Sequence, residues 1–269
     1  MIESMTERLY PTPYADVNEV LHDFLASIQA LLGSRFLGMY VLGSLALGDF
    51  DPCTSDIDFI VITDTDIGDD LFPRLQDLHA NFVLSSSPWA AKVEAVYVPQ
   101  TTLRRPVPTS SRYPQVEKGR PLAREPLKSG WVFQCYTLRE HGVVVAGPDP
   151  RTLVDPINPQ DIPPAVAAIS GLWLEQARHD PTWLDWLRPR GNQVFVILTL
   201  CRMLYSLHTG SVASKTVAAQ WAQKELEPPW AALIARSLAG QDEFGEIPPA
   251  DVDDTVAFIQ YTLEQSRPC

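Results

Sequence analysis

The hydrophobic pattern of this chain changes character near residues 150–160. Before that point, strand-like apolar runs at 36–42, 57–63, 92–98 and 143–146 alternate with helical stretches at 16–32 and 69–82. The run at 57–63 is rich in β-branched residues, which favour strands. After that point apolar residues recur at three- and four-residue steps, and 192–207 is apolar nearly all round, as in a buried helix. The pattern predicts an α/β N-terminal half and an all-α C-terminal half.

Several residues indicate how individual helices begin and which faces they bury. We expect Asp16 to cap the first helix and Ser214 to cap a helix that runs to Leu226, because Asp and Ser accept hydrogen bonds from free N–H groups of a first turn. A shared apolar face is predicted for Ala165, Ile169, Leu172, Trp173 and Ala177, and another for Val252, Val256, Ile259 and Leu263.

Composition limits the class of protein. The formal net charge is −12, which disfavours binding to nucleic-acid phosphates and attracts cationic small molecules, although excess acid can also serve solubility alone. No apolar stretch is long enough to span a membrane, and residues 1–8 lack the pattern of a signal peptide. The four cysteines, Cys53, Cys135, Cys201 and Cys269, are scattered without a CxxC pair. We therefore expect a cytoplasmic protein without membrane or nucleic-acid partners, and a monomer.

Residues 99–130 differ from the acidic remainder. Seven Lys and Arg face two Glu there, and six prolines interrupt the segment. Proline at this density opposes a regular helix or a central strand. We expect a long ordered loop or cleft lip, or a basic linker without a role. The basic residues are Arg104, Arg105, Arg112, Lys118, Arg120, Arg124 and Lys128, and the prolines are Pro99, Pro106, Pro108, Pro114, Pro121 and Pro126.

The residues that carry chemistry follow the first predicted strand. Gly43 and Ser44 end that strand, and Asp56 and Asp58 open the next one, twelve and fourteen residues after Ser44. Residues i and i+2 of a strand project to the same face, so the two carboxylates should lie together. Such a pair is favourable when a divalent cation lies between the carboxylates. A solvated strand start is the alternative interpretation.

Glu94 is a third carboxylate, in the middle of the apolar run at 92–98. A buried glutamate is costly unless it faces a polar cleft or a metal. The whole pattern predicts a nucleotidyltransferase: Asp56 and Asp58 bind Mg²⁺ with a nucleoside triphosphate, and Glu94 completes the metal site or takes a proton from the attacking hydroxyl. The sequence contains no P-loop, dinucleotide-binding glycine motif, zinc-protease motif or nucleophile elbow.

The motifs at 40–44 and 55–61 resemble those of the polymerase-β-type nucleotidyltransferase superfamily. Over roughly residues 36–260 the chain is similar to the aminoglycoside (3″)(9)-adenylyltransferases, the streptomycin/spectinomycin resistance enzymes. Segments that carry this resemblance lie at 92–98, 112–114, 138–142, 147–148, 196–206 and 215–222. It implies an α+β fold: an N-terminal nucleotidyltransferase α/β domain with a small mixed sheet over 1–157, then a C-terminal all-α helical bundle domain over 158–269.

The resemblance also implies roles by position. Asp56 and Asp58 would bind Mg²⁺, and Glu94 would be the catalytic base. Gly43, Ser44 and Ser55 would surround the phosphates of ATP, and Arg202 and Lys215 would reach the triphosphate from the helical domain. The sequence context of Arg202 and Lys215 agrees with this phosphate-binding role. Arg202 is the one charge in an apolar helix, and Lys215 lies at the start of a helix, a place that favours anions. A structural salt bridge and a solvated surface lysine are the alternatives.

The chain departs from the drug-resistance enzymes in the acceptor region. It is about ten residues shorter between Arg112 and Glu125, and Phe195 replaces a polar contact residue. Trp183 and Asp185 could supply an aromatic ring and a carboxylate for a cationic acceptor, although a tryptophan pair such as Trp183 and Trp186 is also typical of a core.

Three functions remain open at this stage. The first is Mg²⁺-dependent transfer of AMP from ATP to a hydroxyl of an aminoglycoside-type antibiotic, with release of pyrophosphate. The second is the same chemistry on another small molecule or a protein acceptor. The third is a non-catalytic nucleotide-binding module, against which the intact Asp56, Asp58 and Glu94 argue.

Overall fold

A computed structural model describes residues 10–104, 111–117, 120–239 and 249–267 of the chain. The chain divides into two compact units, Met1–Leu127 with Thr137–Pro156, and Lys128–Tyr136 with Ile157–Cys269. Helix α4, Trp131–His141, contributes residues to both units. The segment Lys128–Tyr136 thus groups with the helical unit although it lies before the predicted domain boundary. Arg105, Pro106, Pro108, Lys118 and Cys269 lie outside the described residues.

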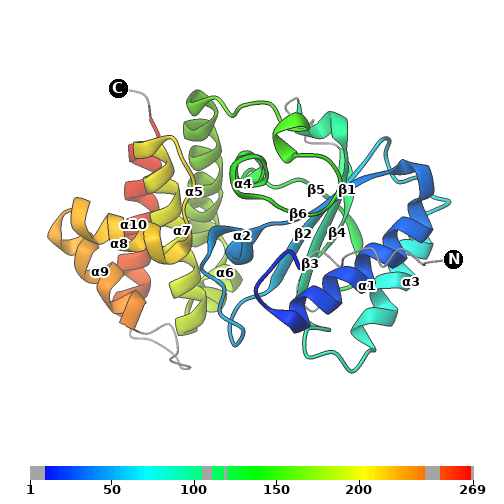
Figure 1. Cartoon of the computed structure of the whole chain (residues 1–269). Helices are drawn as coiled ribbons and strands as arrows, with labels where there is room; N and C mark the ends of the chain where they lie inside the picture. Colours follow the sequence, from blue (N-terminus) through cyan, green and yellow to red (C-terminus); the bar gives the residue numbers. More distant parts are fainter. Residues whose placement is uncertain (1–9, 105–110, 118–119, 240–248, 268–269) are drawn as a thin grey trace, which may run out of the picture. The chain divides into compact units, whose positions relative to one another are not determined.

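The first unit is built on a six-stranded mixed sheet in the order β5-β4-β3-β2-β1-β6 (Figure 1). Strands β2 and β3 are parallel, and all other neighbouring strands are antiparallel. This arrangement and the helical second unit confirm the predicted fold class. The strands are β1 Phe36–Val41, β2 Ile57–Thr63, β3 Val93–Pro99, β4 Arg112–Val116, β5 Ala123–Pro126 and β6 Val143–Ala146.

Helices α1, Ala15–Leu32, and α3, Phe72–Val83, lie next to each other on one side of the sheet (Figure 1). The strand residues that pack into their core alternate along each strand, for example Ile57, Phe59 and Val61 of β2. Successive residues of a strand face opposite sides. The residues between them, which include Asp58, therefore face the side of the sheet away from α1 and α3.

The start of α1 differs from the prediction. Tyr14 is the N-cap residue and makes no side-chain cap, while Asp16 lies within the first turn. The Oδ2 atom of Asp16 accepts a hydrogen bond of 2.9 Å from the indole Nε1 of Trp89. The predicted cap was therefore wrong, because a partner far along the chain takes up the carboxylate.

The segment 99–130 contains two strands, β4 and β5, which the proline content did not predict. Pro114 lies in β4, a strand that has β3 on one side and β5 on the other, and Pro126 is the last residue of β5. β4 pairs with β3 through Gln115 and Val116 only, so Pro114 adjoins β5 alone. A proline fits a strand where the ladder requires no N–H donor. The remaining short elements of this unit are η1 Gly33–Arg35, α2 Gly43–Leu47, η2 Gln100–Leu103 and η3 Pro150–Thr152.

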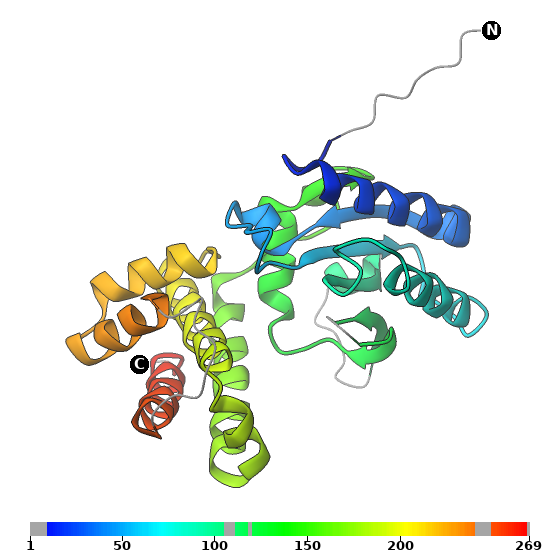
Figure 2. The ribbon, with the colours of Figure 1, turned by 90° about the horizontal axis from the view of Figure 1, so that it is seen from below.

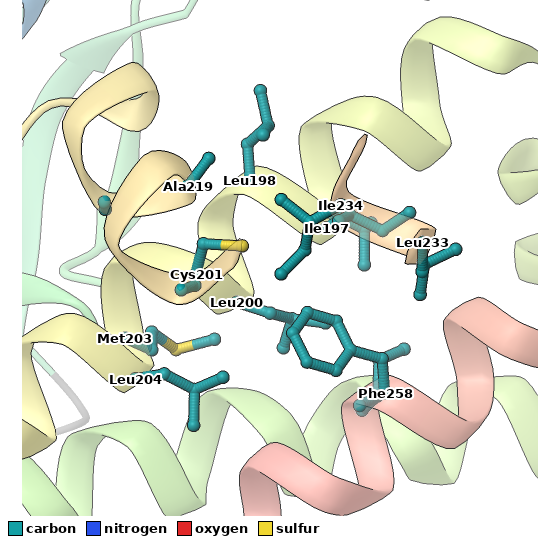
Figure 3. Packing of buried hydrophobic residues seen from close by; sticks show 14 of the residues in the cluster. Ile197, Leu198, Leu200, Cys201, Met203, Leu204, Ala219, Leu233, Ile234 and Phe258 are labelled. Atoms are coloured by element: carbon teal, nitrogen blue, oxygen red, sulfur yellow. The ribbon is translucent and has the colours of Figure 1, made fainter. Parts of the chain in front are cut away.

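The second unit is helical. Helix α8 packs against α7 and α9, and α10 packs against α5 and α7 (Figure 2). In Figure 3 the Phe258 ring of α10 reaches toward Leu200 of α7, and Ile234 of α9 lies beside Ile197. The helices, with one 3-10 turn, are η4 Pro159–Asp161, α5 Ile162–His179, α6 Pro181–Leu187, α7 Arg190–Thr209, α8 Lys215–Glu225, α9 Pro228–Ala239 and α10 Pro249–Gln265.

Two predictions about this unit have different outcomes. Ser214 caps α8 as predicted, since its hydroxyl accepts a hydrogen bond from the backbone N–H of Val217. Leu172 is 57% exposed and does not share the buried face of Ala165 and Ala177, so that part of the prediction was wrong. Within the described residues, no helix is long and apolar enough to cross a membrane.

Candidate functional site

The carboxylates singled out in the sequence lie at the N-terminal ends of the two central strands of the sheet, β2 and β3. Asp56 directly precedes β2, and Asp58 faces Glu94 across the parallel β2–β3 pair. Residues in facing positions of neighbouring strands project from the same side of a sheet. All three residues are partly buried. The side of the sheet away from α1 and α3 thus presents a group of acidic side chains, which we call the carboxylate edge: Asp56, Asp58 and Glu94.

Gly43 lies against the carboxylate edge. Its φ of +59° is in the left-handed region, and a Cβ at this position would lie 1.9 Å from Oδ2 of Asp58. Only glycine meets both conditions without strain. Gly43 and Ser44 do not form a simple turn, as the sequence suggested: they begin the five-residue helix α2. The backbone is fixed here as well, because the N–H of Leu42 donates to the carbonyl oxygen of Asp58 at 2.9 Å.

The loop before β2 is held by its own side chains. Asp51 accepts hydrogen bonds from the backbone N–H of Cys53 at 2.8 Å and from the hydroxyl of Thr54 at 3.2 Å. The hydroxyl of Ser55 accepts a 3.0 Å hydrogen bond from the N–H of Asp51. Lys92, which immediately precedes β3, donates from Nζ to the carbonyl oxygen of Cys53 at 2.9 Å. These bonds fix the approach to Asp56, and they place Ser55 in the loop that leads to it.

The carboxylate edge fits a magnesium site that a substrate completes. Among the described residues, no three His, Cys, Asp or Glu side chains form a ready group of metal ligands. Magnesium often takes one or two protein carboxylates, with substrate phosphates and water as its other ligands. The Oδ1 atom of Asp56 is buried, and the absence of a Cβ at Gly43 lets the Asp58 carboxylate lie against the backbone at the start of α2. Asp56 and Asp58 could therefore hold the metal together with a triphosphate.

The two predicted phosphate-binding cations lie on α7 and α8, which pack against each other in the helical unit. The Nε atom of Arg202, on α7, donates to the carbonyl oxygen of Ala213 at 3.1 Å. Ala213 directly precedes Ser214, the N-cap of α8, and Lys215 is the first residue of that helix. The Nζ atom of Lys215 lies 5.3 Å from the centre of the Phe195 ring. Sequence reasoning missed this contact, because it joins residues of two helices. We call Phe195, Arg202 and Lys215 the cationic cluster.

The two residues proposed for the acceptor, Trp183 and Asp185, lie on the short helix α6. Trp183 is 9% exposed and belongs to the helical core, with its ring centre 5.9 Å from that of Trp186. Asp185 is exposed and pairs with Arg188 at 3.2 Å. Trp183 thus agrees with the alternative of a core tryptophan, whereas Trp186 is 41% exposed and does not belong to the core. The roles of Trp183 and Asp185 at an acceptor stay predictions.

The chain is similar to known adenylyltransferases along most of its length. Residues 152–264 match the family model described as "Aminoglycoside adenylyltransferase, C-terminal domain". The chain is 28% identical to an aminoglycoside (3″)(9) adenylyltransferase of Escherichia coli, over 85% of this chain and 88% of that protein. It is 32% identical to one of Rhizobium radiobacter, over 48% of this chain and 45% of the relative.

The fold is also that of a solved structure. This is the spectinomycin adenyltransferase AAD(9) from Enterococcus faecialis with ATP and spectinomycin, which has a TM-score of 0.71, 18% identity and coverage of 91% of this chain and 98% of that chain. Together the comparisons confirm the resemblance predicted from the sequence, and with it the nucleotidyltransferase class.

Proposed function

We propose that this protein transfers AMP from ATP to a hydroxyl of an aminoglycoside-type antibiotic, streptomycin- or spectinomycin-like, and releases pyrophosphate. The observation that carries this proposal is the facing pair Asp58 and Glu94, next to Gly43, in a chain similar to aminoglycoside (3″)(9) adenylyltransferases. The solved relative of the same fold was obtained with ATP and spectinomycin, which supports ATP as the nucleotide.

Asp56 and Asp58 would hold Mg²⁺, which when bound neutralises charge on the phosphates. Glu94 is then the group placed to accept a proton. Its carboxylate takes the proton from the acceptor hydroxyl as the hydroxyl oxygen bonds to the α-phosphorus of ATP. The bond from the α-phosphorus to the oxygen bridging to the β-phosphate breaks, and pyrophosphate leaves with that oxygen. Glu94 is partly buried and lies between the apolar residues Val93 and Ala95 of β3.

Arg202 and Lys215 supply positive charge for the triphosphate. The chain is strongly acidic, with a formal net charge of −12, so a bound polyphosphate needs local cations. Arg202 donates through Nε to the carbonyl oxygen of Ala213, which orients its guanidinium, a group whose planar fork suits phosphate.

The acceptor is the open part of the proposal. An acidic surface favours a cationic acceptor, as aminoglycosides are. The shorter segment between Arg112 and Glu125 keeps a second candidate in view, the same transfer to another small molecule or to a protein side chain. Because ATP is the donor, we place the reaction in the cytoplasm.

The test is a mass-spectrometric assay of AMP transfer from ATP with Mg²⁺, against spectinomycin, streptomycin and other aminoglycosides. We expect one member of the panel to gain the mass of AMP. Asp58→Asn should abolish the product, because it removes a carboxylate from a hard-cation site. Asp64→Asn is the matched control, since this exposed residue follows the opposite end of β2. Release of pyrophosphate with none of these acceptors modified would favour the second candidate.

A further inference from the structure

We propose that Lys92 is a positioning residue, which holds the Asp56 carboxylate where it binds the metal. This inference rests on the proposed function, because it concerns how the carboxylate edge binds Mg²⁺ with ATP. Lys92 lies directly before β3. Its Nζ atom donates to the carbonyl oxygens of Pro52, at 3.1 Å, and Cys53, at 2.9 Å. Hydrogen bonds from an ammonium group are stronger than those between neutral groups.

The backbone of Lys92 holds the chain on the other side of Asp56. The carbonyl oxygen of Lys92 accepts a hydrogen bond of 2.8 Å from the N–H of Ile57, the first residue of β2. Asp56 therefore lies between two attachments to the same residue. The first is Cys53, three residues before it, and the second is Ile57, directly after it. The hydrogen bonds of Asp51 join the loop to itself, whereas the ammonium of Lys92 joins it to the start of β3.

Two residues from outside β3 orient the Lys92 side chain. The Nζ atom of Lys92 lies 5.2 Å from the centre of the Trp89 ring, within the range of a cation–π interaction. Trp89 is buried in the core of the first unit, and its indole Nε1 donates to Oδ2 of Asp16 at 2.9 Å. Asp16 lies in the first turn of α1, where a carboxylate is stabilised. Helix α1 thus anchors the ring that contacts the ammonium.

The position of Asp56 matters because Mg²⁺ demands near-ideal octahedral geometry. The Oδ1 atom of Asp56 is buried, and a closely packed side chain has little freedom to turn. The direction of this carboxylate therefore follows from its backbone, which Lys92 holds on both sides. Lys92 thus acts on the metal through Asp56, as an outer partner of a metal ligand.

The experiment is calorimetric titration of ATP into the whole chain and the variants Lys92→Met, Lys92→Arg and Lys224→Met, once with MgCl₂ and once with EDTA. The measured quantity is the factor by which Mg²⁺ strengthens ATP binding. We expect Lys92→Met to reduce this factor about tenfold, the lower end of the range for outer partners of metal ligands, because its two hydrogen bonds are exposed. Binding in EDTA should not change, since ATP without a metal does not use Asp56.

Lys92→Arg should restore the factor to within about threefold of the wild type, because a guanidinium also donates to carbonyl oxygens and stacks on an indole ring. Lys224→Met is the matched control. It makes the same substitution at an exposed residue of α8 and should change binding in neither solution.

Three results would overturn the inference while the proposed function stands. If Lys92→Met weakens ATP binding equally in MgCl₂ and EDTA, Lys92 serves nucleotide binding in general and does not act through the metal ligand. If Lys92→Met changes neither, the loop keeps its position without the ammonium. If Lys92→Arg reduces the factor as far as Lys92→Met does, the donors of the side chain do not hold the loop. A wild-type chain that does not bind ATP, or binds it equally with and without Mg²⁺, contradicts the proposed function and with it this inference.

Discussion

Gly43 and Asp58 are in such close contact that a Cβ on Gly43 would lie 1.9 Å from the Oδ2 atom of Asp58. The two residues come from different elements, the start of α2 and the second position of β2. Asp58 also faces Glu94 on β3. Gly43 therefore determines where the Asp58 carboxylate can lie. The position of that carboxylate in turn determines where a metal ion and its bound phosphates would bind.

We expect Gly43→Ala to reduce AMP transfer about 100-fold or more, because a misplacement of about 1 Å in a catalytic group has an effect of that size. The variant should also lose about 1–2 kcal/mol of stability, since alanine is disfavoured at a φ of +59°. Transfer rates and urea unfolding would measure the two effects separately.

Gly48→Ala is the control for that experiment. Gly48 has a φ of +72°, but nothing lies within 4 Å of the position of its Cβ. It should lose similar stability and keep its activity. Equal activity losses in both variants would show that backbone strain, rather than the contact with Asp58, governs the site.

The sequence predicted individual helices and strands better than it predicted the contacts between them. Strand β2 spans the predicted residues 57–63, because a run of β-branched residues has a strong local preference for strand. The facing of Asp58 and Glu94 depends on parallel pairing between strands more than thirty residues apart, and local pattern does not fix such a register. The grouping of Asp56, Asp58 and Glu94 was therefore predicted from the chemistry of the three side chains. The structure adds the register of β2 and β3, which puts Asp58 opposite Glu94.

Other features depended on contacts that no local rule contains. Asp16 binds the indole of Trp89 instead of capping its helix, and Lys215 lies over the ring of Phe195. The strand β4 was missed because proline content was weighed against it, although Pro114 lies where the ladder to β3 has not begun. In each case tertiary contact overrides a sound local preference.

The second prediction concerns Glu94. If it is the base, Glu94→Gln should bind ATP with Mg²⁺ as the wild type does, and turnover should fall by about 10²–10⁴-fold, the usual contribution of a positioned base. Calorimetry and steady-state rates measure the two quantities. Glu125→Gln, which alters an exposed carboxylate of β5 paired with Arg112, should leave both unchanged. Weakened ATP binding by Glu94→Gln would instead assign Glu94 to the metal.

The third prediction concerns Arg202. ATP at about 100 times its dissociation constant should stabilise the wild type by about 2.7 kcal/mol. Arg202→Gln removes the charge but keeps an amide donor for the carbonyl oxygen of Ala213, so the fold should persist while the stabilisation by ATP falls well below 1 kcal/mol. Thermal melts with and without ATP give the readout.

Arg236→Gln provides the comparison for Arg202. Arg236 pairs with Asp251 at 3.3 Å and with Asp254 at 2.9 Å in the same helical unit. Its loss should lower the melting temperature and leave the shift caused by ATP intact. A full ATP shift in Arg202→Gln would limit Arg202 to holding the start of α8.

The last prediction concerns a buried histidine on the other side of the sheet, in the α1–α3 core. The Nε2 atom of His79 and the hydroxyl of Tyr97 are 2.7 Å apart, and His79 is 4% exposed. Burial lowers the pKa of His79 from 6.5 to about 4. Between pH 6.5 and about 4, His79 therefore binds a proton in the unfolded chain and does not bind one in the folded chain.

Stability from the neutral His79 should be fully present above pH 6.5 and should be lost progressively as the pH falls from 6.5 toward 4. The size of the pKa shift corresponds to a loss of about 3 kcal/mol. His79→Gln cannot titrate but can still bond to the Tyr97 hydroxyl, so its free energy of unfolding should fall less over this range. Urea unfolding at a series of pH values, compared with the exposed control His208→Gln, measures the difference. Parallel pH profiles for the wild type and His79→Gln would mean that His79 is protonated in the folded chain, and that its burial does not govern its charge.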